Sequence, residues 1–371
     1  MHWQRVRVVA PVIVCLFMLG LLCDLTTWAS HSQHLPSRVI QHFLRSDSSE
    51  TMVTTDPSRR AKAAIVVVAR NSDLPGVLLS MQSMERRFNG KYHYPYVFLN
   101  EDAFDSEFRQ RTSASTQSRT LYGLIPEEHW SLPDWLDQEE FDAARDRMRH
   151  AEVKYGDMAS YHFMCRFFSG FFQHHPLLQE FDYYWRMEPN VHYHCDLDYD
   201  PFVFMEDRGI QYGFVIALLE LPNTIPSLWN TTQAFMEQHA QQLPQENLME
   251  YVTTNSGQDY NLCHFWSNFE IGSFKFLRSK EYQAYFNYLD QAKGFFMERW
   301  GDAPVHSLGV AMLLNKSQVH HFQDIGYSHD PSTHCPARHR NNCACDPIRS
   351  IDFRVSRARD CSTRWTEFLN S

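Results

Sequence analysis

The sequence predicts an α/β fold, built on an open sheet flanked by helices. Short β-branched or aromatic runs alternate with longer runs of helical spacing, a pattern typical of open α/β sheets. The first run, Ala63 to Ala69, is apolar throughout, as in a strand buried on both faces. The composition, 43% hydrophobic and 14% aromatic, supplies a sizeable core and excludes disorder for most of the chain. A net charge of −10 argues against nucleic acid as a partner.

The N-terminal segment sets the compartment. Residues 8–25 are mostly apolar and follow Arg5 and Arg7, so they predict a signal-anchor transmembrane helix with residues 1–7 as a cytoplasmic tail. A cleaved signal peptide is the alternative interpretation. Either way the body enters the secretory pathway. Residues 26–60 are rich in polar side chains without a hydrophobic period, and they predict a stem.

The elements of the body follow in order. Further strands are expected at Tyr94 to Leu99, Tyr183 to Met187, Gln211 to Leu219 and Val319 to Ile325. Helices are expected at Leu74 to Phe88, Glu139 to Val153, Met158 to Phe172, Pro226 to His239, Glu281 to Ala292 and Val305 to Leu314. Asp73 is the expected cap of the first helix.

Seven cysteines follow the anchor segment. In an oxidising lumen they favour disulfides, and because seven is odd, at least one is free or intermolecular. Cys343 and Cys345 are too close in sequence for the usual spacing of a structural zinc site. The sequons at Asn230 and Asn315 are candidate N-glycosylation sites of a lumenal body.

Polar residues that end apolar strands are candidates for a ligand site, because open α/β sheets bind ligands beyond the carboxyl ends of their strands. Arg70, Glu188 and Glu220 occupy such positions. Glu188 precedes Pro189, which turns the chain and exposes a carboxylate suited to Mn²⁺ or Mg²⁺ bridging a diphosphate. A solvated turn is the alternative.

Two later segments mix polar and apolar residues. In Tyr260 to Gly272, polar groups interrupt an apolar stretch, and sugar hydroxyls could partner them. Glu270 in this segment is either a carboxylate that acts on a developing positive charge or a buried carboxylate paired with an arginine. Asp302 and His329 lie in loops with Gly and Pro, where His329 could ligate a metal.

The runs YPYVFLNE, YWRMEPNV, YNLCHFWSNFEIG, ERWGDAPVHS and DIGYSHDP resemble the fungal Golgi α-1,2-mannosyltransferases, glycosyltransferase family 15. The resemblance covers residues 61–336 and leaves residues 337–371 as a Cys- and Arg-rich tail. It implies a GT-A-type nucleotide-sugar-binding fold with an open mixed sheet. It also implies a Golgi type II membrane enzyme that moves mannose from GDP-mannose, with Mn²⁺ and with retention, to the 2-hydroxyl of a mannose on a glycoprotein N- or O-glycan.

The resemblance also assigns residues. It implies that Glu188 and His329 hold Mn²⁺ and that Glu270 is the nucleophile or the stabiliser of an oxocarbenium-like transition state. The donor-binding residues are then expected to be Arg70, Tyr161, Arg186 and Asp302, and the acceptor- or sugar-binding residues Tyr260, His264, Trp266 and Asn268. The sequence departs from the family's usual Glu-Pro-Asp by carrying Asn190.

Two other functions fit the sequence. The chain could be a catalytically weak mannan-binding or scaffold subunit, and assembly with related transferases is an expectation for either role. A secreted glycosidase, the third interpretation, needs no metal.

Overall fold

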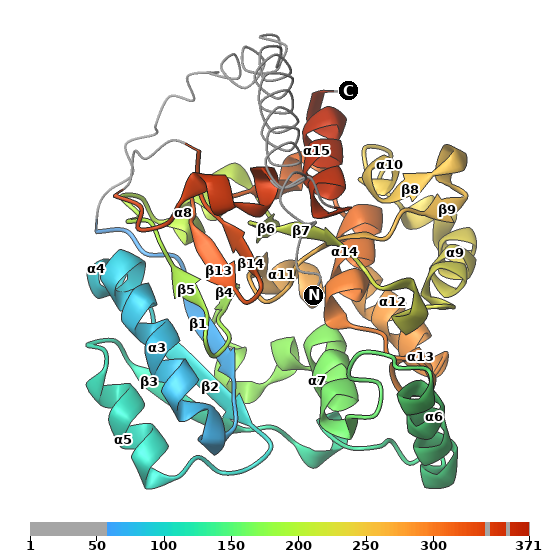
Figure 1. Ribbon diagram of the computed structural model, residues 1–371, viewed down its shortest axis with the longest axis horizontal. Coiled ribbons are helices and arrows are strands. Elements are labelled where there is room, and N and C mark those ends of the chain that lie inside the picture. Colours follow the sequence, from blue (N-terminus) through green and yellow to red (C-terminus); the bar gives the residue numbers. More distant parts are fainter. Residues whose placement is uncertain (1–57, 338–341, 354–356, 371) are drawn as a thin grey trace, which may run out of the picture. The chain divides into compact units, whose positions relative to one another are not determined.

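A mixed sheet organises the structure, a computed structural model that describes residues 58–337, 342–353 and 357–370 (Figure 1). Within these residues the sheet has seven strands in the order β12-β6-β11-β4-β1-β2-β3. Their bounds are β1 (Ala63–Val68), β2 (Tyr96–Asn100), β3 (Thr120–Leu124), β4 (Tyr183–Arg186), β6 (Tyr212–Phe214), β11 (Ile271–Ser273) and β12 (Val319–His321). The predicted open α/β sheet is therefore confirmed.

Parallel pairing brings strand ends to one edge of the sheet. Strands β3, β2, β1 and β4 pair in parallel, whereas β11 pairs antiparallel with both β4 and β6. Val66 of β1 lies opposite Arg186, the last residue of β4. Side chains that follow these two strands consequently lie close together at the carboxyl edge.

Alternating residues of β1 enter two different cores, one on each face of the sheet. Ala64 and Val66 belong to the core formed with α7 (Ala159–Gly170), α12 (Lys280–Gln291) and α14 (Asp302–Leu313). Ile65 and Val67 belong to the core on the opposite face, formed with α3 (Leu74–Met84), α5 (Ser106–Ala114) and α8 (Pro201–Arg208). This two-sided burial is why the strand is apolar at every position. In Figure 1, α3 and α5 lie on one side of the β1–β3 strands.

Smaller elements surround the sheet. The short sheets are β7 (Ala217–Leu219) with β10 (Cys263–Phe265), β8 (Thr253–Thr254) with β9 (Asp259–Tyr260), and β5 (His192–Tyr193) with β13 (Tyr327–His329) and β14 (Ser332–His334). The other helices are α4 (Gly90–Tyr92), α6 (Gln138–His150), α9 (Leu228–His239), α10 (Met249–Val252), α11 (Phe274–Leu277), α13 (Gly294–Met297) and α15 (Arg357–Asn370).

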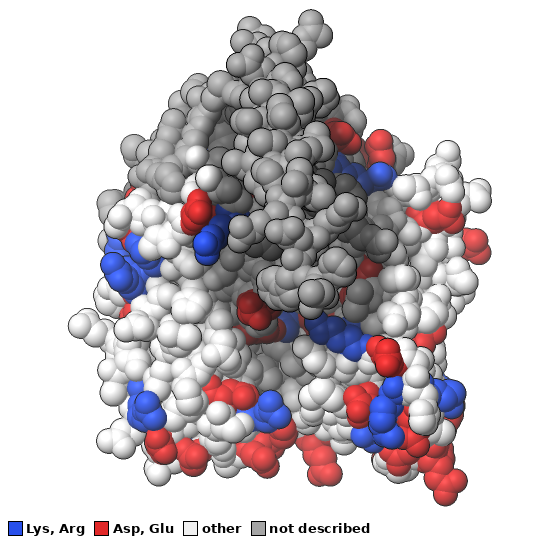
Figure 2. Space-filling model, in the orientation of Figure 1, with Lys and Arg blue, Asp and Glu red and all other residues white. Residues whose placement is uncertain are grey.

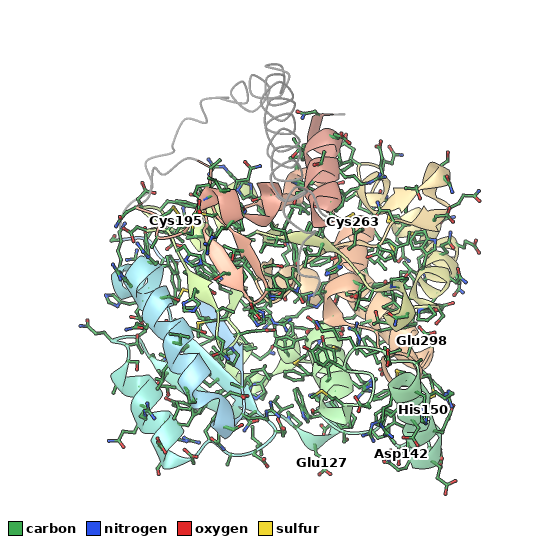
Figure 3. The ribbon with its side chains drawn as sticks, viewed as in Figure 1. Glu127, Asp142, His150, Cys195, Cys263 and Glu298 are labelled. Atoms are coloured by element: carbon green, nitrogen blue, oxygen red, sulfur yellow. A yellow bond between two sulfur atoms is a disulfide. The ribbon has the colours of Figure 1, made fainter. Side chains whose placement is uncertain are left out.

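The C-terminal tail packs within the same compact unit, which runs from Ser58 to Ser371. Trp365 of α15 is 1% exposed and belongs to the core that contains Phe265. Three disulfides tie the tail down, namely Cys195–Cys343, Cys263–Cys361 and Cys335–Cys345. Cys195 and Cys263, which are labelled in Figure 3, lie apart from each other in the fold. Their disulfides therefore attach the tail at two separate places. Cys165 is a buried free thiol, so the inference from an odd cysteine count is confirmed.

Two sequence predictions need adjustment. The single strand expected from Gln211 to Leu219 is two strands, β6 and β7, which belong to different sheets. The expected cap, Asp73, makes no side-chain bond to the helix, and its carboxylate accepts instead from the backbone N–H of Arg70 at 2.9 Å.

The predicted anchor at residues 8–25 lies outside the described residues. Among the described helices, none is both long enough and apolar enough to cross a membrane.

Candidate active site

Arg186 is the centre of the candidate site. It ends β4, is 2% exposed, and lies over the ring of Phe168 at 3.6 Å. Its Nη1 donates to Asp302 Oδ2 at 2.5 Å, and its Nη2 donates to Glu188 Oε1 at 2.6 Å. A single guanidinium thus joins two carboxylates that come from distant parts of the sequence, which is a geometry that the planar fork of arginine allows.

Asp302 is held as an anion. It is the first residue of α14 and also accepts a hydrogen bond from Ser267 Oγ at 2.6 Å. Burial alone would raise the pKa of Asp302, but the charges of Arg186 and His306 and the Ser267 hydrogen bond hold it below its usual value. The N-terminus of α14 favours negative charge at the same place.

Glu188 and His329 face each other beside this network. His329 ends β13, and its Nε2 lies 3.6 Å from Glu188 Oε2. Both side chains are partly exposed, at 25% for Glu188 and 29% for His329. The indole of Trp266 meets the imidazole edge-on at 5.6 Å between ring centroids. The structure thus brings Glu188 and His329 together, while their role as metal ligands stays a prediction.

A carboxylate oxygen and an imidazole nitrogen that face each other are ligands that a divalent cation such as Mn²⁺ accepts. The Nδ1 of His329 is buried without a hydrogen-bond partner. In the part of the chain that the structure describes, no group of three or more His, Cys, Asp or Glu side chains is arranged to hold a metal. The pair therefore fits an ion that takes its other ligands from water and from substrate phosphates, as such ions do in nucleotide sites.

Glu270 is buried more deeply than Glu188. It is 0% exposed, and both carboxylate oxygens are occupied. Tyr184 donates to Oε1 at 3.0 Å, while Tyr212 at 2.9 Å and His306 Nδ1 at 2.9 Å share Oε2. The partners of this buried carboxylate are thus a histidine and two tyrosines, rather than the arginine that was the alternative expectation.

His306 and Glu270 form a buried ion pair. Burial opposes a charge on the imidazole, but the charge of Glu270 and its hydrogen bond raise the pKa of His306 above the usual 6.5. The opposite ring nitrogen, Nε2, lies 2.9 Å from the carbonyl oxygen of Phe168. Both imidazole nitrogens thus have acceptors, as a protonated histidine requires.

A second group of polar side chains lines the other side of Asp302. Arg299 and Glu220 are 3.6 Å apart, and the guanidinium of Arg299 lies 5.5 Å from the centre of the Tyr161 ring. His264 is 5% exposed, and its Nδ1 is buried with no partner, as is the Nε of Arg299. Buried polar atoms without partners are rare, so these two nitrogens are candidates for contact with a polar ligand.

The other predicted residues lie at varying distances from this centre. Arg70 follows β1, and its side chain is 61% exposed, within reach of a ligand at the carboxyl edge. Asn268 is buried and accepts from Tyr327 at 3.1 Å. Tyr260 donates to the carbonyl of Cys263 at 3.0 Å, and its ring stacks on Trp229, so no contact joins it to Glu188 or Asp302.

Sequence reasoning missed Ser267, Arg299 and His306. Ser267 lies in the run YNLCHFWSNFEIG, and Arg299 and His306 lie in ERWGDAPVHS, but their pairing depends on which strands and helices become neighbours. His306 falls four residues after Asp302 on α14, a helical spacing that places both on one face and could have indicated His306 as a site residue.

Figure 2 shows acidic and basic side chains meeting in a hollow in the middle of the face it presents.

Comparisons with known proteins show which family the chain resembles. The sequence model of a family described as glycolipid 2-alpha-mannosyltransferase matches residues 31–370. Alpha-1,2 mannosyltransferase KTR1 of Saccharomyces cerevisiae is 48% identical over 310 residues, which cover 82% of this chain and 78% of that protein. O-glycoside alpha-1,2-mannosyltransferase omh1 of Schizosaccharomyces pombe is 44% identical over 299 residues, which cover 80% of this chain and 77% of that protein.

Solved structures are similar as well. Core-mannan synthase A (CmsA/Ktr4) of Aspergillus fumigatus, in its Mn/GDP form, superposes with a TM-score of 0.79 at 40% identity, covering 85% of this chain and 87% of that chain. The mannosyltransferase Ktr4p of S. cerevisiae in complex with GDP gives a TM-score of 0.79 at 39% identity, covering 83% and 82%. These similarities support the mixed α/β fold described above.

Proposed function

This chain belongs to the glycolipid 2-alpha-mannosyltransferase family, and we propose that it moves mannose from GDP-mannose to the 2-hydroxyl of an acceptor mannose, with retention of configuration. The fold is of the GT-A type in this proposal. The acceptor is a mannose on a glycoprotein N- or O-glycan. Relatives are named for glycolipid and for O-glycoside acceptors, so the family name alone does not select one.

The observation that carries the proposal is the cluster at the end of β4. Arg186 joins Asp302 and Glu188, and Glu188 faces His329 across 3.6 Å. These groups come from three separate parts of the chain, because Arg186 and Glu188 share one segment. Two carboxylates, a buried guanidinium and an imidazole at a strand end have the chemistry to bind a sugar diphosphate and its cation.

Glu188 and His329 are the residues that would hold Mn²⁺. When bound there, the ion offsets the negative charge that grows on the departing diphosphate. Arg186 keeps the Glu188 carboxylate in place through its 2.6 Å hydrogen bond. Arg70, exposed at the neighbouring strand end, is positioned to contact the nucleotide from the other side.

Glu270 acts in this proposal as a stabilising anion beneath the mannose site. Attack on the anomeric carbon requires an accessible carboxylate oxygen, whereas Glu270 is 0% exposed and both oxygens accept hydrogen bonds. The burial therefore favours retention by same-face attack over a glycosyl-enzyme formed on Glu270. Asp302, held ionised beside Arg186, orients the sugar hydroxyls in this proposal.

The polar group beyond Asp302 is the place for the acceptor. His264 and Arg299 have buried nitrogens without hydrogen-bond partners, and hydroxyls of the acceptor can form hydrogen bonds with them. Trp266 offers a flat face on which a sugar ring can pack. Asn268 supports this part of the site by accepting a hydrogen bond from the hydroxyl of Tyr327.

The compartment belongs to the same proposal. Residues 8–25 anchor the chain in the Golgi membrane as a single-pass type II protein, residues 26–60 form the stem, and the catalytic domain is lumenal. The three disulfides support a lumenal body, since such bonds persist in oxidising compartments.

A donor assay tests the function. The purified chain is given labelled GDP-mannose, UDP-glucose or UDP-galactose together with methyl α-mannoside and Mn²⁺. We expect transfer from GDP-mannose and none from either UDP-sugar. A chelator should abolish this transfer, and added Mn²⁺ should restore it. Tight mannoside binding without turnover would favour the scaffold role instead, and transfer insensitive to the chelator would contradict the metal site.

A further inference from the structure

Asn190 occupies a special backbone position in the turn that carries Glu188. Its φ is 64°, in the left-handed region that asparagine tolerates better than other residues with a side chain. Its backbone N–H donates to the carbonyl of Gly76 at 3.0 Å. The turn thus bends away from β4 and rests on the first turns of α3.

The side chain of Asn190 also lies against α3. A Cβ placed on Gly76 would be 2.7 Å from both Oδ1 and Nδ2 of Asn190, closer than real Cβ contacts. The amide therefore covers Gly76. No contact joins the Asn190 side chain to Glu188 or to His329 among the described hydrogen bonds and ion pairs.

Two serines on the same face of α3 complete the attachment. Ser80 is fully buried, and its hydroxyl donates to the carbonyl of Glu188 at 2.8 Å and accepts from Val191 N at 3.0 Å. One turn further on, Ser83 Oγ accepts from Tyr193 N at 3.2 Å. Residues 76, 80 and 83 follow helical spacing, so one face of α3 holds the backbone of the whole Glu188 turn.

We infer that Asn190, Gly76 and Ser80 are positioning residues for the metal ligand Glu188, and that residue 190 serves through its left-handed backbone rather than through charge. The inference rests on the proposed function, because it takes Glu188 as a ligand of Mn²⁺. An asparagine in place of the family's aspartate then preserves the metal site.

Substitutions at residue 190 separate backbone from charge. In the full chain with GDP, calorimetric Mn²⁺ titration should give N190D and N190G within about threefold of wild type, because aspartate and glycine also accept a left-handed backbone. N190V should weaken Mn²⁺ binding about tenfold, since a β-branched residue is strained there and the ligand it supports moves. An N190D protein that binds Mn²⁺ ten times more tightly would overturn the inference.

A double substitution tests the contact with α3. G76A should weaken Mn²⁺ binding about tenfold, because its Cβ displaces the Asn190 amide. Adding N190G removes the amide, so the double variant should return to within about threefold of wild type. A double variant that keeps the full loss of G76A would contradict the proposed contact.

Ser80 and Ser83 form a matched pair of variants. S80A should weaken Mn²⁺ binding about tenfold, with turnover restored by excess Mn²⁺, whereas S83A should stay within about threefold. Equal Mn²⁺ affinities for S80A and S83A would overturn the role of Ser80. E188Q is the control for the premise that Glu188 binds Mn²⁺. Unchanged Mn²⁺ affinity in E188Q would contradict the proposed metal site, independently of the role of residue 190.

Discussion

Replacing Arg186 with lysine should destabilise the fold. Its guanidinium reaches Asp302 and Glu188 together, and the group is almost fully buried. Lysine cannot make both bonds in one plane. R186K should lower the free energy of unfolding by about 1–3 kcal/mol, because the ammonium keeps the charge but leaves one of the two carboxylates without its hydrogen bond.

Urea denaturation measures this loss, and R119K is the matched control. Arg119 pairs with Glu180 on the surface, with both side chains more than half exposed. R119K should therefore change the free energy of unfolding by less than about 1 kcal/mol. Equal effects of R186K and R119K would show that the buried bridge is not a distinct electrostatic unit.

The proposed metal ligands give a second prediction at this scale. E188Q and H329Q should each lower kcat/KM for GDP-mannose by about 10²-fold or more, since a metal contributes several kcal/mol to transition-state stabilisation. His329 is partly exposed, so thermal unfolding of H329Q should change little, whereas E188Q removes one charge partner of the buried Arg186 and should lower the Tm. Steady-state kinetics at several Mn²⁺ concentrations measures the effect. Normal kcat/KM at limiting Mn²⁺ in both variants would exclude the pair as ligands.

The pair of His306 with Glu270 predicts a pH dependence of stability. The folded pKa of His306 is raised above 6.5, so the pair stabilises the fold fully below pH 6.5, and this contribution is lost as pH rises through the raised value. Wild type should lose more free energy of unfolding than H306Q between about pH 6 and about pH 9. His334 also has a raised pKa, so the comparison uses the difference between the two proteins, measured by urea denaturation at each pH. Parallel pH profiles would contradict a charged His306.

At the scale of elements, the C-terminal helix is attached by a covalent bond next to the site. Cys361 of α15 is joined to Cys263 of β10, across a separation of 98 residues. Cys335–Cys345 spans a separation of only 10 residues. Chain entropy predicts that C263A/C361A loses about 2 kcal/mol more stability than C335A/C345A. Denaturation of the two double variants measures the difference, and a larger loss from the short loop would contradict this ranking.

The two sequons differ in their surroundings. Asn230 is exposed on α9, whereas Asn315 is half-buried and its side chain takes part in a capping box with Gln318. We expect Asn230 to carry a glycan and Asn315 to be largely unmodified when the chain is secreted from a eukaryotic host. Peptide mass spectrometry before and after glycosidase treatment decides this, and full occupancy at Asn315 would contradict it.

Elements were predictable where the pattern was strong. The strand at Ala63 was predictable because it is buried along nearly its whole length. Helices α9 and α12 were predictable because their buried residues recur every three or four positions. The division at residues 211–219 was not predictable. Val215 and Ile216 are buried between β6 and β7, so hydrophobicity continues while the chain changes sheet.

At the scale of the whole molecule, the sequence pointed to several residues of the candidate site, but not to Ser267, Arg299 and His306 and not to how the side chains pair. Glu188, His329, Arg186 and Asp302 come together as expected. The occupancy of both Glu270 oxygens depends on Tyr212 and His306, which β6 and α14 bring to one point. Only the three-dimensional arrangement of these elements shows that Glu270 is fully enclosed. The placement of the C-terminal tail also depends on long-range disulfides, which spacing alone does not determine.

The most direct test of the account is the structure of the product. The chain is incubated with GDP-mannose, Mn²⁺ and methyl α-mannoside, and the disaccharide is characterised by NMR spectroscopy. The account predicts a new α-anomeric mannose joined to the 2-hydroxyl of the acceptor, formed by wild type and lost in E188Q. A β-linked product, a linkage to another hydroxyl, or an undiminished yield from E188Q would contradict it.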